Sequence, residues 1–303
     1  MVLRTLELEG FEPTGYLIQL NSYENRVFSI ELEKREPLIA KFYRPGRWSK
    51  NTILDEHRFI QELVIEGIPA APPIPLSSGS TITECAGMFV ALFEKIKGRS
   101  PDEFLKGDLE RIGRRLAQVH NVGARKSAPH RPSLTVNEFG YSSLEVLKKW
   151  VWPELWERYR KAALSIFDEL DGGLKHFEYL RIHGDCHRGN LVNNGEEFFF
   201  VDFDDCVNGP TVQDIWMLAQ GNEEETEDQT EELLYGYEQL RTFDWDSLEL
   251  VEPLRALRLI HYSAWIARRW KDPSFPKLFP QFNTYNYWLE ELDMIERVVH
   301  NGQ

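Results

Sequence analysis

The chain is poor in cysteine: its 303 residues include only Cys85, Cys186 and Cys206. None of them forms a C-x-x-C pair, which excludes the usual zinc and redox motifs built from two close cysteines. So few cysteines favour a reducing compartment, and we expect a cytoplasmic protein. A basic and apolar leader is also lacking, and proline or charged residues interrupt every apolar run before membrane-spanning length. We therefore expect no membrane partner.

Basic residues are the scarcer charge. The sequence has 35 Lys and Arg against 49 Asp and Glu, a formal net charge of −14 at pH 7. Such an acidic chain disfavours nucleic acid or an anionic membrane as its main partner. Its length suggests about two domains that bury about three quarters of their unfolded surface. The oligomeric state is left open, with a monomer as the simplest arrangement.

The most informative segment is residues 182–206, IHGDCHRGNLVNNGEEFFFVDFDDC. Apolar runs at residues 180–182 and 198–201 predict two strands. Between them, Asn193-Asn194-Gly195 provides residues that tolerate positive φ, which predicts a tight hairpin turn.

A hairpin at this turn pairs residues 191–192 with the strand that leads to Asp202, and so brings Asn190 and Asp202 to one open end. Amide and carboxylate oxygens are the ligands that Mg²⁺ takes from proteins, while phosphate and water complete its coordination. Asp185, five residues before Asn190, is placed to accept a proton from an attacking hydroxyl group. We therefore predict a phosphotransfer site in which Asp185 is the base and Asn190 and Asp202 bind magnesium.

Zinc binding is a competing interpretation of the same segment. Adjacent residues in so tight a run rarely close a tetrahedral site, and a zinc site leaves Asn190 and Asp202 without a role. The zinc ligands in that interpretation are His183, Asp185, Cys186, His187 and Cys206.

The triplet Asp202-Phe203-Asp204 also matches the D-x-D pattern of phosphatases that form an aspartyl phosphate on the first aspartate. Such an enzyme would not need Asp185 and Asn190, and the pattern comes late in the chain, which leaves little room for its other catalytic parts. For Asp204 and Asp205 two interpretations stay open: they orient a ligand, or they lie in a solvated turn.

The first third of the sequence predicts a small sheet. The runs VFSIELE, PLIAKFY and MFVALFE are typical of strands. In PLIAKFY, the two-residue alternation puts Lys41 on the face shared by Ile39 and Tyr43. Apolar residues at near-helical spacing predict one helix over residues 51–66, with Asn51 as a possible N-cap.

Beyond residues 94–98 the pattern becomes mainly helical, starting with a helix for which Asp108 is the candidate cap. A basic and aromatic helix is expected at residues 252–270, and the three prolines after it predict an irregular tail. We therefore expect an N-terminal lobe at residues 1–94 and a C-terminal lobe at residues 95–303, joined by a hinge.

Taken together, these residues carry a family resemblance. His183-Gly184-Asp185, Asn190 and Val201-Asp202-Phe203 resemble the HGD…N…DF signature of the aminoglycoside phosphotransferases and choline kinase-like enzymes, which are relatives of the protein kinases. LNSYENRVF, KFYRP, DDCVNGPTVQDIWML and EPLRALRLIHYSAWIARRW resemble the stress response kinases, bacterial serine/threonine protein kinases of that superfamily. The resemblance implies an α+β, two-lobed protein kinase-like fold with a small antiparallel-sheet N-lobe and a mainly helical C-lobe.

The resemblance also implies roles outside the hairpin. Lys41 and Ser22 would hold ATP phosphates, and a helix glutamate would hold Lys41. Glu56 suits that role better than Glu62 because of its spacing to the Ile-Pro segment that follows. The segment that would bind adenine through its backbone is the hinge Glu94, Lys95 and Ile96.

The loop at residues 21–25 departs from the protein kinases, whose phosphate-covering loop is rich in glycine, because it contains no glycine. The Ser22 hydroxyl and nearby backbone N–H groups would then donate to phosphate instead. Farther along, Asp214 resembles the family's structural aspartate that braces the catalytic turn.

The implied activity is an ATP- and Mg²⁺-dependent phosphotransfer, and a serine/threonine protein kinase able to phosphorylate itself is the first interpretation. The wider superfamily phosphorylates amino alcohols, sugars and antibiotics, so a small alcohol is the alternative acceptor. A second alternative is a nucleotide-sensing protein without turnover. The hairpin residues do not distinguish among these acceptors.

Overall fold

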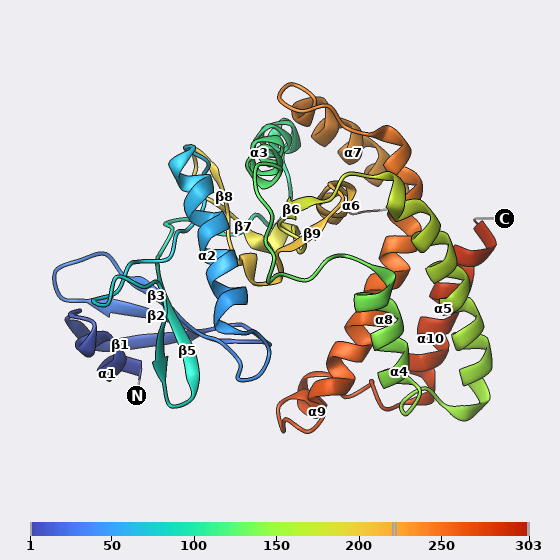
Figure 1. Ribbon diagram of the computed structural model, residues 1–303, viewed down its shortest axis with the longest axis horizontal. Helices are drawn as coiled ribbons and strands as arrows, with labels where there is room; N and C mark the ends of the chain where they lie inside the picture. Colours follow the sequence, from blue (N-terminus) through green and yellow to red (C-terminus); the bar gives the residue numbers. More distant parts are fainter. Residues whose placement is uncertain (1, 220, 222, 302–303) are drawn as a thin grey trace. The chain divides into compact units, whose positions relative to one another are not determined.

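The computed structural model describes residues 2–219, 221 and 223–301 (Figure 1). The strands are β1 (Pro13–Leu20), β2 (Arg26–Leu32), β3 (Leu38–Phe42), β4 (Thr83–Cys85), β5 (Met88–Glu94), β6 (Leu180–Ile182), β7 (Leu191–Asn193), β8 (Phe198–Phe200) and β9 (Val207–Gly209). The α-helices are α1 (Val2–Leu8), α2 (Lys50–Ile65), α3 (Asp108–Gly123), α4 (Ser142–Leu147), α5 (Pro153–Gly173), α6 (Val212–Leu218), α7 (Glu223–Tyr237), α8 (Val251–Arg269), α9 (Phe275–Leu278) and α10 (Tyr285–Asn301). No helix in these ranges has the length and apolar character needed to cross a membrane.

The chain divides into two compact units. The first comprises residues 1–131, 180–207 and 217–243, and the second comprises residues 132–179, 208–216 and 244–303. All residues that the sequence predicts to bind nucleotide or metal, or to act as base, lie in the first unit. These units divide the chain at other places than the lobes expected from the sequence, and the hinge near residues 94–98 stays a prediction.

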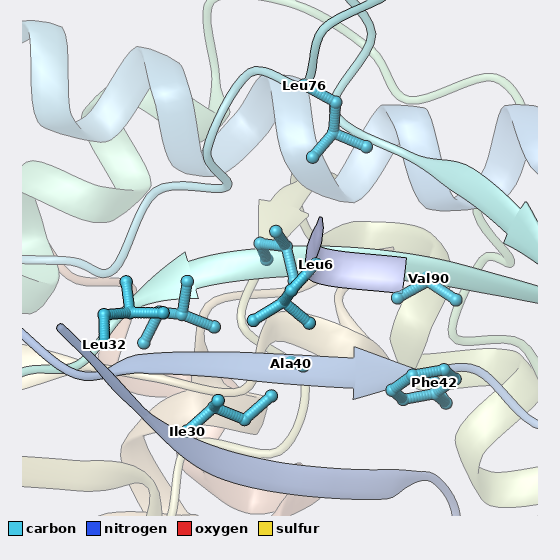
Figure 2. Close-up of a cluster of buried hydrophobic side chains, with 9 residues drawn as sticks. Leu6, Ile30, Leu32, Ala40, Phe42, Leu76 and Val90 are labelled. Carbon is cyan, nitrogen blue, oxygen red and sulfur yellow. The ribbon is translucent and has the colours of Figure 1, made fainter. Parts of the chain in front are cut away.

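A five-stranded antiparallel sheet, with the order β1-β2-β3-β5-β4, forms the N-terminal part of the first unit. On β3 the side chains alternate, so that Ala40 and Phe42 enter an apolar cluster on one face (Figure 2). Leu6 of α1 packs into this cluster. The buried members of the cluster are Leu6, Ile30, Leu32, Leu38, Ala40, Phe42, Leu76, Val90 and Leu92.

The opposite face of the sheet carries Lys41 and packs against α2. The ring of His57, on α2, meets that of Phe93, on β5, edge to face with centroids 5.7 Å apart. The helix begins after Ser49, whose Oγ accepts a hydrogen bond from Thr52 N at 3.2 Å. The expected helix is thus confirmed, but the prediction of Asn51 as its N-cap is wrong by two residues.

Some other helix boundaries differ from expectation. The N-cap of α3 is Gly107, because Asp108 is already the first helical residue and its carboxylate accepts from Leu105 N at 3.0 Å. The N-terminal helix α1 was not expected. The expected irregular tail is wrong beyond residue 284, because the prolines end at Pro280 and the 17-residue α10 follows.

The second unit is helical. Within it α5, α8 and α10 pack together, and α8 confirms the helix expected at residues 252–270. Its buried side is apolar, as its spacing predicts, with Leu254, Leu257, Ile260 and Ala264. Aromatic rings fill the region between these helices, and Trp288 of α10 is fully buried.

Candidate active site

A tight turn after β6 carries Asp185. Gly184 has φ +79°, and a β-carbon there would overlap the backbone oxygen of Asp205, so the turn requires glycine. Before it, His183 Nε2 lies 3.0 Å from Val201 O, and the imidazole packs on Phe203 with ring centroids 4.4 Å apart. The turn of Asp185 is therefore fastened directly to the segment that carries Asp202.

The predicted hairpin is present between β7 and β8. Leu191 pairs with Phe200 and Val192 with Phe199. Because Val201 N donates to Asn190 O at 3.0 Å, the residue before Asp202 lies against Asn190, as the hairpin predicts.

The amide group of Asn190 is oriented by Asp185. Asn190 Nδ2 donates to Asp185 O at 2.9 Å and to Asp185 Oδ2 at 3.3 Å. This orientation leaves Asn190 Oδ1, the oxygen suited to a hard cation, available on the other side of the amide. Asp202 presents a carboxylate that is 54% exposed, of which Oδ1 faces Lys41. These two oxygen donors fit Mg²⁺, which keeps several water and phosphate ligands.

The backbone of Asp202 is unusual, with φ 60° and ψ 60° in the left-handed region. Residues other than glycine rarely adopt it, and such strain gathers at functional sites. The conformation lets the chain turn directly from β8 into the helical turn Phe203–Asp205. As a consequence, the carboxylates of Asp202 and Asp204, two residues apart, both contact Lys41.

Three carboxylates surround the Lys41 ammonium group, which is almost fully buried. Its Nζ lies 3.0 Å from Asp202 Oδ1, 3.2 Å from Asp204 Oδ1 and 3.4 Å from Glu56 Oε1. Burial alone would lower the pKa of Lys41, but the three carboxylates outweigh burial and raise this pKa well above its ordinary value. Lys41 is therefore a firmly protonated cation.

Of the two glutamates considered for the lysine, the structure brings Glu56 to it. Glu56 is 1% exposed, and burial raises its pKa to about 7 although Lys41 opposes the shift. Glu62 instead forms ion pairs with Lys126 and Arg181, each at 2.8 Å.

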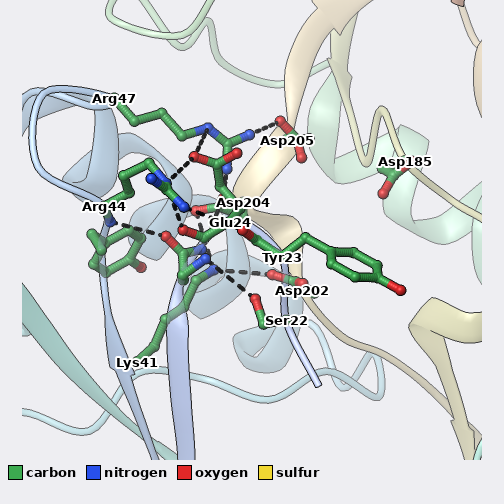
Figure 3. A network of polar contacts seen from close by, with 12 residues as sticks. Ser22, Tyr23, Glu24, Lys41, Arg44, Arg47, Asp185, Asp202, Asp204 and Asp205 are labelled. Atoms are coloured by element: carbon green, nitrogen blue, oxygen red, sulfur yellow. Dashed lines mark hydrogen bonds and ion pairs between the residues drawn. The ribbon is translucent and has the colours of Figure 1, made fainter. Parts of the chain in front are cut away.

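The interpretation as a solvated turn residue is wrong for Asp204, whereas the Asp205 side chain is 48% exposed. Asp204 is 3% exposed, and Arg47 forms ion pairs with both carboxylates (Figure 3). Arg131 donates to the backbone oxygens of Asp204 and Cys206, both at 2.6 Å. The pKa of Asp204 is lowered, because Lys41, Arg47 and Arg131 outweigh its burial.

The glycine-free loop at residues 21–25 is tied to this network. Ser22 Oγ accepts from Asn25 N at 3.2 Å, so the hydroxyl proton of Ser22 can still be donated to a ligand. Asn25 Nδ2 donates to Asp204 Oδ2 at 3.1 Å, and Asn25 Oδ1 accepts from Arg44 N at 3.2 Å. Figure 3 shows Ser22 joined to the network by a hydrogen bond, and Asp185 apart from it.

Other predicted residues are also located. Glu94 ends β5, and Lys95 and Ile96 continue without regular structure. Asp214, in the first turn of α6, is buried and belongs to the second unit. Sequence reasoning missed Asn25, Arg47 and Arg131, which all contact Asp204 across 73 to 179 residues of the chain, so no local pattern marks them.

The zinc interpretation finds no support in the described residues, which contain no group of three His, Cys, Asp or Glu side chains placed to hold a metal ion. His183 contacts a backbone oxygen and an aromatic ring instead. His187 Nδ1 accepts from Gly189 N at 3.0 Å, and its Nε2 lies 3.5 Å from Asp185 Oδ2.

The model of the phosphotransferase enzyme family matches residues 17–251. The chain belongs to this family. The match begins within β1 and includes Lys41 and the whole hairpin. It favours the kinase interpretation of Asp202-Phe203-Asp204 over the phosphatase one. Membership confirms the prediction of a phosphotransferase enzyme.

Two relatives share most of their length with this member of the family. Stress response kinase A of Escherichia coli (strain K12) is 39% identical over 297 residues, which are 96% of this chain and 89% of the relative. Serine/threonine protein kinase RdoA of Salmonella typhimurium is 37% identical over 294 residues, or 95% of this chain and 88% of the relative. The resemblance to the stress response kinases is thus confirmed.

Solved structures of two kinases have the same fold. Amicoumacin kinase hAmiN, in complex with AMP-PNP, Ca²⁺ and Ami, has a TM-score of 0.79 at 20% identity and covers 97% of this chain and 92% of its own. A microcompartment-associated aminopropanol kinase has a TM-score of 0.78 at 19% identity, and the match covers 99% of this chain and 97% of the kinase. The predicted two-lobed kinase-like fold, with an antiparallel sheet and a mainly helical remainder, is confirmed.

Proposed function

We propose that this enzyme transfers the γ-phosphoryl group of ATP to a serine or threonine hydroxyl of a protein, with Mg²⁺ held by Asn190 and Asp202. The observation that carries the proposal is the convergence of one buried ammonium group, Lys41, with Asp202 beside the turn of Asp185. In phosphoryl transfer, positioning and charge neutralisation supply most of the catalysis, and these groups provide both.

Lys41 and Ser22 bind the phosphates in this proposal. A triphosphate that enters the site replaces Asp202 as a partner of Lys41, while Glu56 and Asp204 keep the ammonium group in place. The Ser22 hydroxyl donates to a phosphate oxygen, and the backbone at Glu94–Ile96 binds the adenine. Mg²⁺, when bound, neutralises phosphate charge that Lys41 alone cannot offset.

Asp185 receives the proton. As the acceptor oxygen bonds to the γ-phosphorus, the bond from that phosphorus to the β,γ-bridging oxygen breaks and ADP leaves. The proton of the acceptor hydroxyl passes to the Asp185 carboxylate, which the Asn190 amide orients. Every group in this scheme comes from one chain, so a monomer suffices.

A protein acceptor is favoured because the relatives at 37–39% identity carry the names stress response kinase A and serine/threonine protein kinase. We infer a role in stress response, self-phosphorylation and a cytoplasmic location on the same grounds. The small-alcohol alternative has the support of the aminopropanol kinase fold, but at 19% identity that likeness concerns the fold alone.

The test is ADP release by the purified protein with Mg²⁺ and ATP, measured with a generic dephosphorylated protein and, separately, with amino alcohols and aminoglycosides. Phosphate on protein serine or threonine, lost on addition of EDTA, supports the proposal. Turnover with a small alcohol alone would contradict the protein acceptor, and nucleotide binding without any turnover would favour a sensor.

A further inference from the structure

Glu56 has a second buried neighbour besides Lys41. Tyr43, the residue after β3, places its Oη 3.3 Å from Glu56 Oε1 and 3.0 Å from His57 Nε2. The other ring nitrogen, His57 Nδ1, lies 2.7 Å from Thr81 Oγ1. All four side chains are buried, so these contacts form one continuous chain shielded from water.

While Glu56 is charged, the donors and acceptors of this hydrogen-bond chain can be arranged in only one direction. Burial, helped by Lys41, lowers the pKa of His57 to about 3, so the imidazole is neutral and carries a single N–H. The carboxylate of Glu56 can only accept, so the single hydroxyl proton of Tyr43 points to it. Tyr43 Oη must then accept from His57 Nε2–H.

The direction continues to the far end. With its proton on Nε2, His57 has an acceptor at Nδ1, and the Thr81 hydroxyl donates to it. The hydrogen bonds thereby join Tyr43 at the end of β3, Glu56 and His57 on α2, and Thr81 before β4. Each donor in this chain has an acceptor. A buried network in which every donor is satisfied favours a single arrangement of its members.

Tyr43 also contacts the lysine itself. Its ring centroid lies 4.9 Å from Lys41 Nζ, a distance at which the ring face attracts a cation. On the carboxylate side, Glu56 Oε2 is buried and has no hydrogen-bond donor within the described ranges. The donors to this carboxylate are therefore Lys41 and Tyr43, both to Oε1.

We propose that Tyr43, His57 and Thr81 are positioning residues that hold the Glu56 carboxylate against Lys41 through this directed hydrogen-bond chain. The inference rests on the proposed function, because Lys41 matters to catalysis only if it binds phosphate. Without the Tyr43 hydroxyl, Glu56 keeps only the 3.4 Å contact to Lys41. The ammonium group then loses its fixed place, and phosphate binding weakens before the chemical step does.

The kinetic test is a double-mutant cycle of Tyr43→Phe and Glu56→Gln, read as KM for ATP and as kcat. Tyr43→Phe is expected to raise KM roughly 10-fold and to leave kcat within about 2-fold, since a hydrogen bond to a charged group is lost. In the Glu56→Gln background the same change should have almost no further effect. Thr81→Val should raise KM by about 3-fold, and the matched controls Tyr16→Phe and Thr83→Val should not.

A second measurement does not depend on activity. In nucleotide-free protein, ¹⁵N NMR should find His57 neutral with its proton on Nε2, and ¹³C NMR should find the pKa of Glu56 raised further by Tyr43→Phe. The groups that act on this carboxylate are Lys41, Asp204, Arg131, Asp202 and Tyr43, while His57 is linked to it only through Tyr43.

Different results would contradict the positioning role of Tyr43 and the proposed kinase activity. An Nδ1–H tautomer, an unchanged KM in Tyr43→Phe, or effects that multiply in the double mutant would each overturn the positioning chain. If the wild type transfers no phosphate to any acceptor, the proposed function fails, and the NMR readouts still decide the chain.

Discussion

Two buried glutamates, one in each unit, have similarly raised pKa values but different surroundings. Glu56 is 1% exposed and Glu291 is 4% exposed, and burial raises the pKa of each to about 7. Each accepts from a tyrosine hydroxyl, Tyr43 at 3.3 Å and Tyr159 at 2.6 Å. Only Glu56 also faces an ammonium group.

The surroundings of Glu291 consist of hydroxyl groups. Besides Tyr159 it accepts from Ser263 and Tyr287, which brings α5, α8 and α10 to one carboxyl group. Burial raises the pKa of Glu291 more than these three hydrogen bonds lower it. A raised pKa in a buried carboxyl therefore does not mark a catalytic site; the adjacent cation, with further carboxylates on it, makes the difference.

The most severe way to break the cation-centred cluster is Asp202→Asn. Removing this charge takes away a proposed metal ligand, so transfer should fall by about 10³-fold or more. Phosphate incorporation from labelled ATP measures the loss. The matched control Asp168→Asn changes an exposed aspartate of α5 and should keep wild-type rates; equal losses in the two variants would contradict the assignment.

The comparison is tested directly by Glu56→Gln and Glu291→Gln, the same change in the two surroundings. Glu56→Gln should raise KM for ATP by roughly 10- to 100-fold, because Lys41 loses one of its two buried carboxylate partners. Glu291→Gln should leave kcat/KM within about 2-fold. Steady-state kinetics at pH 8 measure both effects. A comparable rise of KM in the two variants would contradict a special role for the carboxylate beside Lys41.

The pH dependence of stability should identify Glu291. Its pKa in the folded protein, about 7, lies above the ordinary value of 4.5, so the folded state binds more protons between these values. This carboxyl group therefore favours the folded state fully below pH 4.5, and its contribution is lost as pH rises to about 7 and beyond. The loss should be on the order of 3 kcal/mol.

Chemical denaturation of wild type and Glu291→Gln at several pH values measures this contribution. The difference between the two proteins in free energy of unfolding should change across pH 4.5–8, with the wild type losing stability relative to the variant. A difference that stays constant over this range would show that Glu291 does not titrate as described.

The smallest expected effect concerns the hydroxyl groups alone. Tyr159→Phe removes one donor to Glu291 and should cost about 1 kcal/mol of unfolding free energy, without changing KM for ATP. Tyr43→Phe also removes a buried hydroxyl and should cost a similar unfolding free energy, but it should in addition raise KM for ATP. Thermal unfolding and steady-state kinetics of both variants measure these effects. An equal effect of the two variants on KM for ATP would contradict the difference between the two glutamates.

Local sequence was enough to predict the hairpin that joins Asn190 to Asp202, because its turn and its register depend on neighbouring residues. Strand alternation likewise predicted the face of Lys41. The burial of Asp204 could not be predicted, since its charge favours exposure and its compensation comes from Arg47, 157 residues away. The helix α10 was missed because the prolines before it dominated the expectation for the whole tail.

Phosphate transfer by the wild type and by Asp185→Ala, each with labelled ATP and Mg²⁺, tests the central claim most directly. In the proposed scheme Asp185 faces the acceptor, so both proteins should still bind ATP, and the backbone contact from Asn190 Nδ2 to residue 185 is kept in the variant. The wild type should place phosphate on protein serine or threonine, and Asp185→Ala should lose about 10³-fold in rate. Equal transfer by the two proteins, or none by the wild type, would contradict the assignment of Asp185, Lys41 and Asp202 to a kinase active site.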